Sequence, residues 1–374
     1  MSALARVMQK FTPSANNRRI GQIGLECSLT EMHLVQLEAD GTGNLSVFAT
    51  ASVPYPCSRD ELFNSPKAMH TVVRQAMASG KFQGHKVVST LPSSNLQIMP
   101  VSYHIGSGKS DDDALLTLLT ERLDGDLTDY VIDYTRVRSA QMGEERQAIV
   151  AVAKRDFVIR YLEALRKSGL EIIHLEIGPS AIRRLVSARS AQSKYENVLA
   201  INFGRKTSYI TVVSGARLLF DQEIRFGEDE LLAHISECLD MSEEAVRQLV
   251  NEYSFDPRTI NKTPAPHNLD VDISSALQEI VKPNFLKLAE EINRTLIYTA
   301  SQTRGESVSR IYLLGGIARW QGCDALLNSL VQLDVETIPN PLQPFTHEST
   351  TTDTARPEIA VATGLAMHGM IEHG

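Results

Sequence analysis

The chain has 374 residues, of which 43% are hydrophobic and 22% charged, and its formal net charge is −8 at neutral pH. This length accommodates roughly two or three domains, and the composition is typical of a globular protein. The acidic balance argues against general nucleic-acid binding, which needs clustered lysine and arginine to contact phosphate. The four cysteines are far apart in sequence, so they indicate neither a zinc site nor a disulfide framework.

No apolar run approaches the ~20 residues that a membrane-spanning helix needs. Residues 1–19 are basic but lack the continuous apolar segment of a secretory signal. We expect them to form a flexible N-terminal arm. The spacing of Leu4, Val7 and Phe11 leaves a short amphipathic helix on a lipid or protein surface as an alternative.

The most informative pattern in the chain occurs twice, and it consists of an apolar strand, a short polar turn and two further strands. The first copy begins at Ile23 and ends with a third strand over 45–53. The second begins at Ala200 and ends with a third strand over 217–224. Turns of such hairpins can direct backbone amides at a phosphate group. Two facing copies therefore indicate a nucleotide cleft built by duplication.

Helical and strand periodicities alternate between the two copies. A helix over 66–79 and a buried strand over 85–92 extend the first unit. The block from 96 to 175 has the pattern of an insertion with its own small core, and a helix over 178–189 follows it. The elements predicted in this block are strands over 96–105, 130–137, 147–153 and 170–177, and helices after the N-cap Ser110 and over 155–168.

The second unit continues with helices over 228–239 and 243–253 and a proline-containing connection over 255–275, which we expect to be mobile. A long helical pattern over 277–303 contains Pro283, which predicts a kink or a break there. The remaining elements are a buried strand over 309–316, a helix over 324–330, a strand over 335–339, a polar loop over 340–357 and a final helix that packs back on the body.

Several stretches, taken in their order and spacing, resemble the PilM family of actin-like type IV pilus assembly proteins. The resemblance covers nearly the whole chain from Ile20 and extends more loosely to the cell-division protein FtsA and the cytoplasmic part of GspL. The stretches that carry it are LPSSNLQIMPV, IVAVAKRDFVIRYLEALRKSGLEIIHLEIGPSAIRRL, RLLFDQEIRFGEDELLAHI, LAEEINRTLIY, IYLLGGIARWQGCDALL and IAVATGLAM.

The resemblance implies an α/β protein with the duplicated ribonuclease H-like, actin-like ATPase fold, in which two lobes carry an inserted small α+β subdomain. The implied domains are the arm at 1–19, lobe I at 20–95, the insertion at 96–175, a return to lobe I at 176–192, lobe II at 193–345 with a helical subdomain and mobile linker at 253–309, and a C-terminal loop and helix on lobe I at 346–374.

The resemblance also implies an adaptor role. The family grips the cytoplasmic tail of a PilN-like inner-membrane protein in a groove beside the inserted subdomain, and it connects indirectly to the pilus motor ATPases. We therefore expect a cytoplasmic protein at the periphery of the inner membrane, with no membrane span and no nucleic acid bound. ATP and Mg²⁺ as cofactors, the absence of any cofactor, and self-association all stay open.

The family's first phosphate turn has the form DxGxxxxK, and Glu26, Ser28 and His33 stand here at the Asp, the Gly and the Lys. A Cβ costs about 1–2 kcal/mol where the backbone needs a positive φ. Histidine is mostly neutral near pH 7, whereas lysine is a fixed cation. Glutamate is one methylene longer than aspartate and would displace a magnesium-bound water. The turn is therefore either a weakened phosphate site, with Glu26 reaching Mg²⁺ through water, or a turn without a ligand.

The second turn resembles DxGxxxT, with Asn202 at the acid and Gly204 retained. Asparagine can bond a magnesium-bound water but brings no charge, and Mg²⁺ prefers carboxylate oxygen. Arg205 and Lys206 either contact phosphate or are solvated turn residues. Because phosphoryl transfer depends on positioning and electrostatics, these departures predict a larger loss of hydrolysis than of binding. We assign no catalytic residue.

Two glycines, Gly315 and Gly316, follow a buried strand, and Arg319 comes shortly after them. The resemblance implies that this loop binds adenosine and that Glu291, on the preceding helix, approaches the ribose. We favour this interpretation for the glycines. For Glu291 we favour an ordinary acid on a helix surface.

Two other functions stay open. The chain could be an active ATPase or a small-molecule kinase of the same superfold, although a sugar kinase needs an aspartate base and neither hairpin supplies one. It could also be an FtsA-like, membrane-tethered filament protein. That function needs a free amphipathic helix, whereas the final helix is rich in small residues and should pack internally.

Overall fold

The computed structural model describes residues 18–105, 110–137, 145–189, 197–215, 217–260, 269–303, 305–338, 340–342, 345 and 356–370. The predicted arm at 1–19 therefore lies outside the described residues except for Arg18 and Arg19. Most of the predicted polar loop at 340–357, and part of the connection at 255–275, lie outside them as well.

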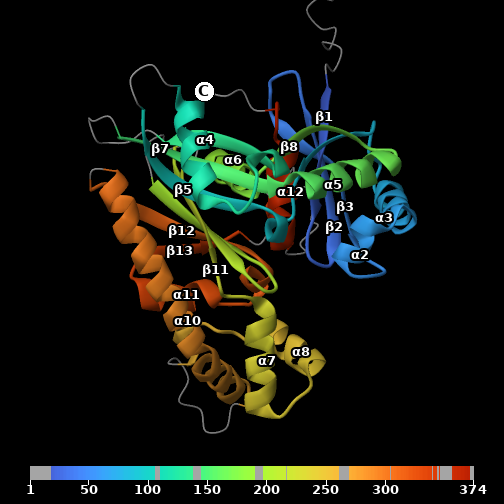
Figure 1. The fold of residues 1–374 in the computed structure, drawn as a ribbon. Helices are drawn as coiled ribbons and strands as arrows, with labels where there is room; N and C mark the ends of the chain where they lie inside the picture. The colour runs from blue at the N-terminus through green and yellow to red at the C-terminus, as the bar shows by residue number, and fades with distance from the viewer. Residues whose placement is uncertain are drawn as a thin grey trace, which may run out of the picture.

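The first lobe is built on a five-stranded sheet in the order β3-β2-β1-β4-β8 (Figure 1). Strands β1, β2 and β3 are antiparallel neighbours, β4 lies parallel to β1, and β8 lies parallel to β4. Both faces of this sheet are buried, Ile23 and Leu25 in one core and Val35 and Leu37 in another. The strands are β1 (Arg19–Cys27), β2 (Glu31–Ala39), β3 (Leu45–Pro54), β4 (Lys86–Thr90) and β8 (Glu171–Glu176).

The second lobe repeats this topology in the order β11-β10-β9-β12-β13. Three antiparallel strands are again followed by two parallel ones. The duplication predicted from the repeated pattern is therefore confirmed. The strands are β9 (Asn197–Phe203), β10 (Ser208–Ser214), β11 (Arg217–Ile224), β12 (Val308–Gly315) and β13 (Asp334–Thr337).

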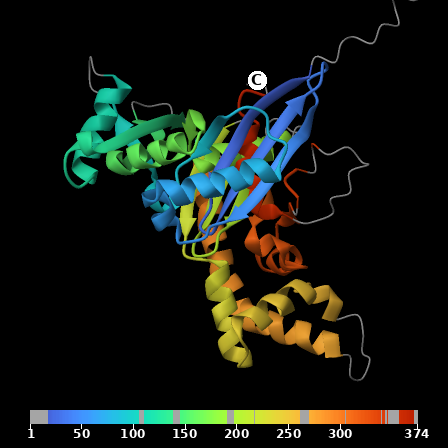
Figure 2. The same cartoon turned by 90° about the vertical axis from the view of Figure 1, so that its right-hand side faces the viewer.

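The inserted subdomain has its own three-stranded sheet in the order β5-β7-β6 and projects to one side of the lobes (Figure 2). Helix α4 (Asp111–Arg122) covers it and begins with a capping box between Ser110 and Asp113. Leu115 and Leu119 of this helix enter the subdomain's separate core. The strands are β5 (Gln97–His104), β6 (Tyr130–Val137) and β7 (Glu145–Lys154), and short 3₁₀ turns lie at η1 (Ser93–Asn95) and η2 (Leu127–Asp129).

The separate sheet ends at Lys154, so the insertion is shorter than the predicted block of 96–175. Helix α5 (Arg155–Lys167) buries Phe157 and Tyr161 in the core of the first lobe, and β8 joins the sheet of that lobe. Both rings contact Phe63 of α2 (Arg59–Asn64) edge to face. Sequence periodicity missed α2 because six residues are too few to show a helical repeat.

Two helices pack between the sheets and join the lobes through one buried core. They are α6 (Gly178–Arg189) and α12 (Ala360–Ala366), which follows the turn η5 (Pro357–Ile359). Every residue of α12 is buried, in agreement with the predicted packing of the final helix. Helix α3 (Pro66–Ser79) packs instead into the core of the first lobe.

The helical part of the second lobe lies at the far end from the first sheet (Figures 1 and 2). Helix α10 begins earlier than predicted and continues through Pro283, so of the predicted kink or break, the break is wrong. Burial of Val281 and Phe285 on either side of Pro283 offsets the hydrogen bond that the proline removes. The helices are α7 (Glu228–Leu239), α8 (Glu243–Glu252), α9 (Pro257–Ile260), α10 (Leu269–Gln302), α11 (Cys323–Val331) and the turn η3 (Gly316–Arg319).

Among the helices in the described ranges, none has the length and the apolar character that crossing a membrane requires.

Replacing Tyr161 with Phe should lower the free energy of unfolding by about 1–3 kcal/mol, because it removes a buried, hydrogen-bonded hydroxyl. That hydroxyl lies 2.7 Å from Ser89 Oγ and 3.1 Å from the Thr90 carbonyl oxygen. These hydrogen bonds link α5 to β4. Chemical denaturation measures the change. The control Tyr134→Phe removes an exposed hydroxyl bonded to Asp112 in the inserted subdomain and should have little effect. Equal losses in both variants would contradict the anchoring of α5.

Candidate functional site

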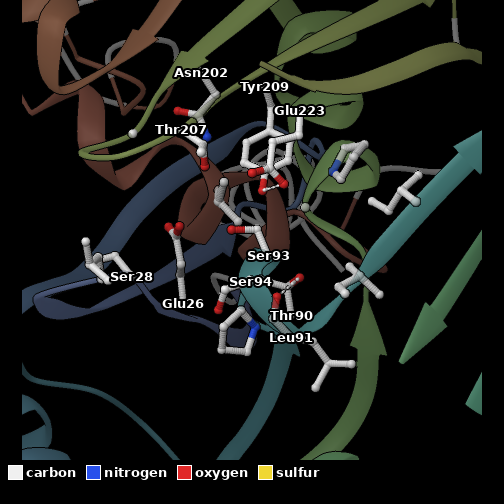
Figure 3. Close-up of a pocket in the computed structure, with 18 of the residues that line it drawn as sticks. Glu26, Ser28, Thr90, Leu91, Ser93, Ser94, Asn202, Thr207, Tyr209 and Glu223 are labelled. Carbon is white, nitrogen blue, oxygen red and sulfur yellow. Dashed lines mark hydrogen bonds between the residues drawn. The ribbon is translucent and has the colours of Figure 1, made fainter. Parts of the chain in front are cut away.

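A cavity of about 1440 Å³ lies between the two lobes and extends along the inserted subdomain. Both hairpin turns line it. Figure 3 shows Glu26 and Ser28 on one side and Asn202 and Thr207 on the other, with Ser93 between them. The structure therefore brings together the two turns that the sequence pattern singled out.

The side chain of Ser28 forms its hydrogen bonds within the first turn. Ser28 Oγ donates a hydrogen bond to the Glu31 carbonyl oxygen at 2.9 Å and accepts one from the Glu31 amide at 3.2 Å. Glu26 is the next-to-last residue of β1 and lies directly opposite His33 of β2 in the antiparallel register. All three predicted residues of this turn, Glu26, Ser28 and His33, line the cavity.

Burial sets the charge of Glu26. Desolvation raises the pKa of this carboxyl to about 8, although the nearby Arg59 guanidinium acts in the opposite direction. Glu358, at the start of the segment leading into α12, raises it further. One carboxyl oxygen of Glu26 has no hydrogen-bond partner among the described residues. Glu26 is therefore mostly protonated and neutral at pH 7.

His33 is neutral as well. Its side chain is buried, and the pKa falls to about 4 because of desolvation and the nearby positive charge of Arg356. The ring Nδ1 lies 2.8 Å from Ser52 Oγ. The residue at the lysine position therefore supplies no cation to the cleft.

The second turn uses most of its polar groups internally. Arg205 donates two hydrogen bonds to Asp229, at 2.9 and 2.7 Å, so its charge is neutralised. A Cβ on Gly204 would overlap the Thr207 carbonyl oxygen. Local packing of the turn is therefore sufficient reason for a glycine at this position. Lys206 is exposed and makes no ion pair with any residue that the structure describes. Asn202, Gly204, Arg205 and Lys206 all line the cavity.

The loop after β12 completes the wall of the second lobe. Gly315 has a φ of +81°, and a Cβ there would overlap the backbone of Phe203. A Cβ on Gly316 would lie 2.9 Å from a carboxyl oxygen of Glu228. Arg319 pairs with that same carboxylate at 3.8 Å. The two glycines therefore bring this loop against the second hairpin, and they line the cavity together with Arg319.

Glu291 does not reach this cavity. It pairs with Arg294 on the same helix at 3.0 Å and lines a separate cavity of about 380 Å³ between α10 and the end of β11. The ribose contact implied by the resemblance therefore has no support in this arrangement, and we omit Glu291 from the proposed site.

Among the charged residues that sequence reasoning missed, Arg59, Glu228 and Glu358 line the cavity near the two turns. Arg59 Nη2 donates a hydrogen bond to Ser94 Oγ at 2.7 Å, while its Nε has no partner among the described residues. These residues come from helix starts far apart in sequence. No local motif connects them, so only the fold reveals that they share the cleft.

The two predicted metal positions offer Mg²⁺ at most one protein carboxyl group, because Asn202 is an amide. Mg²⁺ is usually held by one or two carboxylates and by substrate phosphates. Glu26 is a buried carboxyl whose pKa is raised by desolvation, and Asn202 is an amide. In the described part of the chain, no group of three or more histidine, cysteine, aspartate and glutamate side chains is arranged to hold a metal ion.

The other half of the cavity is a groove beside the inserted subdomain, which we call the insertion groove. One wall is mostly apolar, and the other carries polar and acidic side chains of the second lobe. The groove is lined by Ile98, Met99, Pro100 and Val152 on the first wall and by Tyr209, Phe220, Asp221 and Glu223 on the second.

Comparison with known proteins agrees with this architecture. The structure titled "PilM-PilN type IV pilus biogenesis complex" matches with a TM-score of 0.72 at 22% identity, over 94% of this chain and 99% of that chain. The ethanolamine utilization protein EutJ from Carboxydothermus hydrogenoformans matches with a TM-score of 0.52 at 13% identity, over 93% and 89% of the two chains. These likenesses show a shared fold, the two-lobed actin-like ATPase fold. No curated protein sequence matches significantly.

A family profile extends the comparison to the sequence itself. The profile described as "Type IV pilus assembly protein PilM" matches residues 24–370. The match begins within β1, includes both hairpins and the inserted subdomain, and ends after α12. The chain therefore belongs to the PilM family of type IV pilus assembly proteins.

Proposed function

We propose that this protein is an adaptor of type IV pilus assembly that holds the N-terminal cytoplasmic tail of a PilN-like inner-membrane protein in the insertion groove. It binds ATP weakly at the paired turns and hydrolyses it little or not at all. It works in the cytoplasm at the periphery of the inner membrane, to which the partner tethers it, and it connects indirectly to the motor ATPases. Family membership and the resemblance to a PilM–PilN complex support this proposal.

The observation that carries the reduced hydrolysis is the neutral pair formed by Glu26 and His33. Phosphoryl transfer is catalysed almost entirely by positioning and by electrostatic stabilisation of negative charge. The first hairpin keeps its position in the cleft, but neither a carboxylate nor a cation is present at these two places near pH 7. At the start of α6, Gly178 and Pro179 line the cavity and have no side chain that could orient water.

A peptide in the insertion groove is favoured by the residues that line this groove, which combine one mostly apolar wall with one polar and acidic wall. Peptide grooves join apolar pockets to a few polar groups that set the orientation of the peptide.

The alternative of an FtsA-like membrane helix is not favoured for α12, because every residue of this helix is buried against the body.

The stability of the fold should depend on pH through Glu26. The folded pKa of this acid is about 8, above its ordinary value of 4.5, so folding retains the proton. Stability from this group is therefore fully present below pH ~4.5 and is lost as the pH rises through about 8. Glu26→Gln cannot ionise, so its melting temperature should rise above that of the wild type by a few degrees at pH 9.

The comparison is made by thermal melting from pH 5 to pH 9, with the exposed Glu237→Gln as the control that should follow the wild type. His33 contributes in the opposite direction and at lower pH, because its lowered pKa makes stability fall as the pH drops below ~6.5. A difference between Glu26→Gln and the wild type that stays constant with pH would contradict a protonated Glu26.

Calorimetric titration with ATP and Mg²⁺ should show weak binding, and phosphate release should not exceed the protein-free rate. Lys206→Ala should weaken ATP binding about two- to fivefold, because it removes an exposed cation at the second turn. The control Lys282→Ala removes a cation from α10, where it pairs with Glu279, and should change nothing. Rapid magnesium-dependent turnover by the wild type would refute the loss of hydrolysis.

Ile98→Asp should weaken binding of the PilN-like tail at least about tenfold, because it buries a charge in the apolar wall of the insertion groove. Fluorescence anisotropy with a labelled synthetic tail measures the affinity. The matched control Val131→Asp adds the same charge to β6 of the same sheet, where Val131 is 39% exposed and does not line the cavity. If both variants bind the tail as the wild type does, the tail does not occupy this groove.

A further inference from the structure

The insertion groove contains two carboxyl side chains for which the proposed function gives no role. Asp221 and Glu223 are two residues apart on β11, so they lie on the same face of the strand. Their cross-strand neighbours in β10 are Thr211 and Tyr209. All four side chains line the cavity, and together they form an acidic, hydroxyl-rich strip on the wall of the second lobe.

Asp221 is a buried acid without a cationic partner. Its residue is 3% exposed, and its one recorded hydrogen bond comes from Thr211 Oγ1 at 2.6 Å. Among the described residues, no lysine, arginine or histidine forms an ion pair with it. Desolvation and the neighbouring Glu223 raise its pKa to about 7, and no positive charge counters them. A carboxyl in this environment is stabilised by a cation that arrives from outside the chain.

Glu223 is held in place beside it. The Tyr209 hydroxyl donates a hydrogen bond to Glu223 Oε2 at 2.9 Å, as Figure 3 shows. The same tyrosine interacts with Ser93 of the first lobe. The Glu223 carboxylate is therefore oriented by the protein while its residue stays exposed, which suits an acceptor for a positively charged group.

The opposite wall does not neutralise this strip. Lys154, a cation on that side, is engaged by Tyr130, with its Nζ 2.7 Å from the hydroxyl and 3.8 Å from the ring centroid. Ile98 and Met99 of β5 provide apolar surface there. Strand β11 is the edge strand of its sheet in the described structure, and it lies beside β5 of the inserted subdomain.

We propose that Asp221 and Glu223 recognise an arginine or lysine side chain of the peptide that occupies the insertion groove, so that the groove selects an extended, mainly apolar segment with a positive charge facing β11. This inference rests on the proposed function, and it adds the chemistry by which the tail is chosen. Charge complementarity supports this inference, because the strip is acidic and no lysine, arginine or histidine among the described residues forms an ion pair with Asp221.

The test is a double-mutant cycle with the full-length chain and two synthetic peptides. One peptide is the N-terminal cytoplasmic tail of the PilN-like protein from the same organism, and the other is the same tail with its arginines and lysines replaced by glutamine. The protein variant combines Asp221→Asn with Glu223→Gln, which keep the hydrogen bonds to Thr211 and Tyr209 available. Thermal melting verifies that it is folded, and the exposed Glu252→Gln is the matched control.

The native tail should bind the double variant at least about tenfold more weakly than it binds the wild type or Glu252→Gln. The glutamine-substituted tail should bind the wild type and the double variant with equal, reduced affinity. Acetylating the N-terminus of the native tail should change neither result. The inference is wrong, while the proposed function stands, if the double variant binds the native tail as tightly as the wild type does. The same holds if the double variant binds both tails more weakly than the wild type by the same factor, or if only acetylation of the native tail changes its affinity. If the native tail does not bind the wild type at all, the proposed function itself fails.

Discussion

The packing of α6 and α12 between the two sheets is the constraint on which the cleft depends. A Cβ on Gly24 of β1 would overlap the Ala362 carbonyl oxygen, and one on Gly364 would overlap that of Ala181. Buried Arg184 also bonds the carboxylate of Glu176 and the carbonyl oxygen of Gly364, which ties α6, β8 and α12 together. Because close packing leaves little freedom, this core fixes both hairpins so that their turns face one cavity.

Burial then determines what that cavity can do chemically. Glu26 and His33 face each other across two strands, where an ionised pair would attract. Both are instead held in their neutral forms, because the cost of removing each charge from water exceeds what the nearby charges return. Arg205 is charged, but it forms a salt bridge with Asp229. The cleft thus retains the geometry of a nucleotide site with much of its electrostatic field removed.

The sequence predicted the parts of this structure that local patterns encode. The alternation around Ile23 and Ala200 was enough to identify both hairpins, since strand periodicity is a local property. Residues brought together only by tertiary packing were out of reach, and Arg59 and Glu358 are examples. The assignment of α5 and β8 to the insertion failed for the same reason. Their amphipathic pattern indicates that one face is buried, but it does not indicate which core that face packs against. The position of Glu291 agrees with the favoured interpretation of an ordinary acid on a helix surface, whereas the ribose contact rested on family likeness alone.

The β9–β10–β11 hairpin explains how the cavity could keep its walls while losing charge. Thr207 in its first turn lines the nucleotide half, and Tyr209, two residues later, lines the insertion groove. Both halves are therefore built from one continuous element, and a change that unfolded the turn would also displace the groove wall. Under the proposed function, selection for peptide binding would preserve the hairpin and the close approach at Gly315. The charge of the side chains at positions 26, 33 and 202 is not needed for this wall, so it can change while the wall is kept.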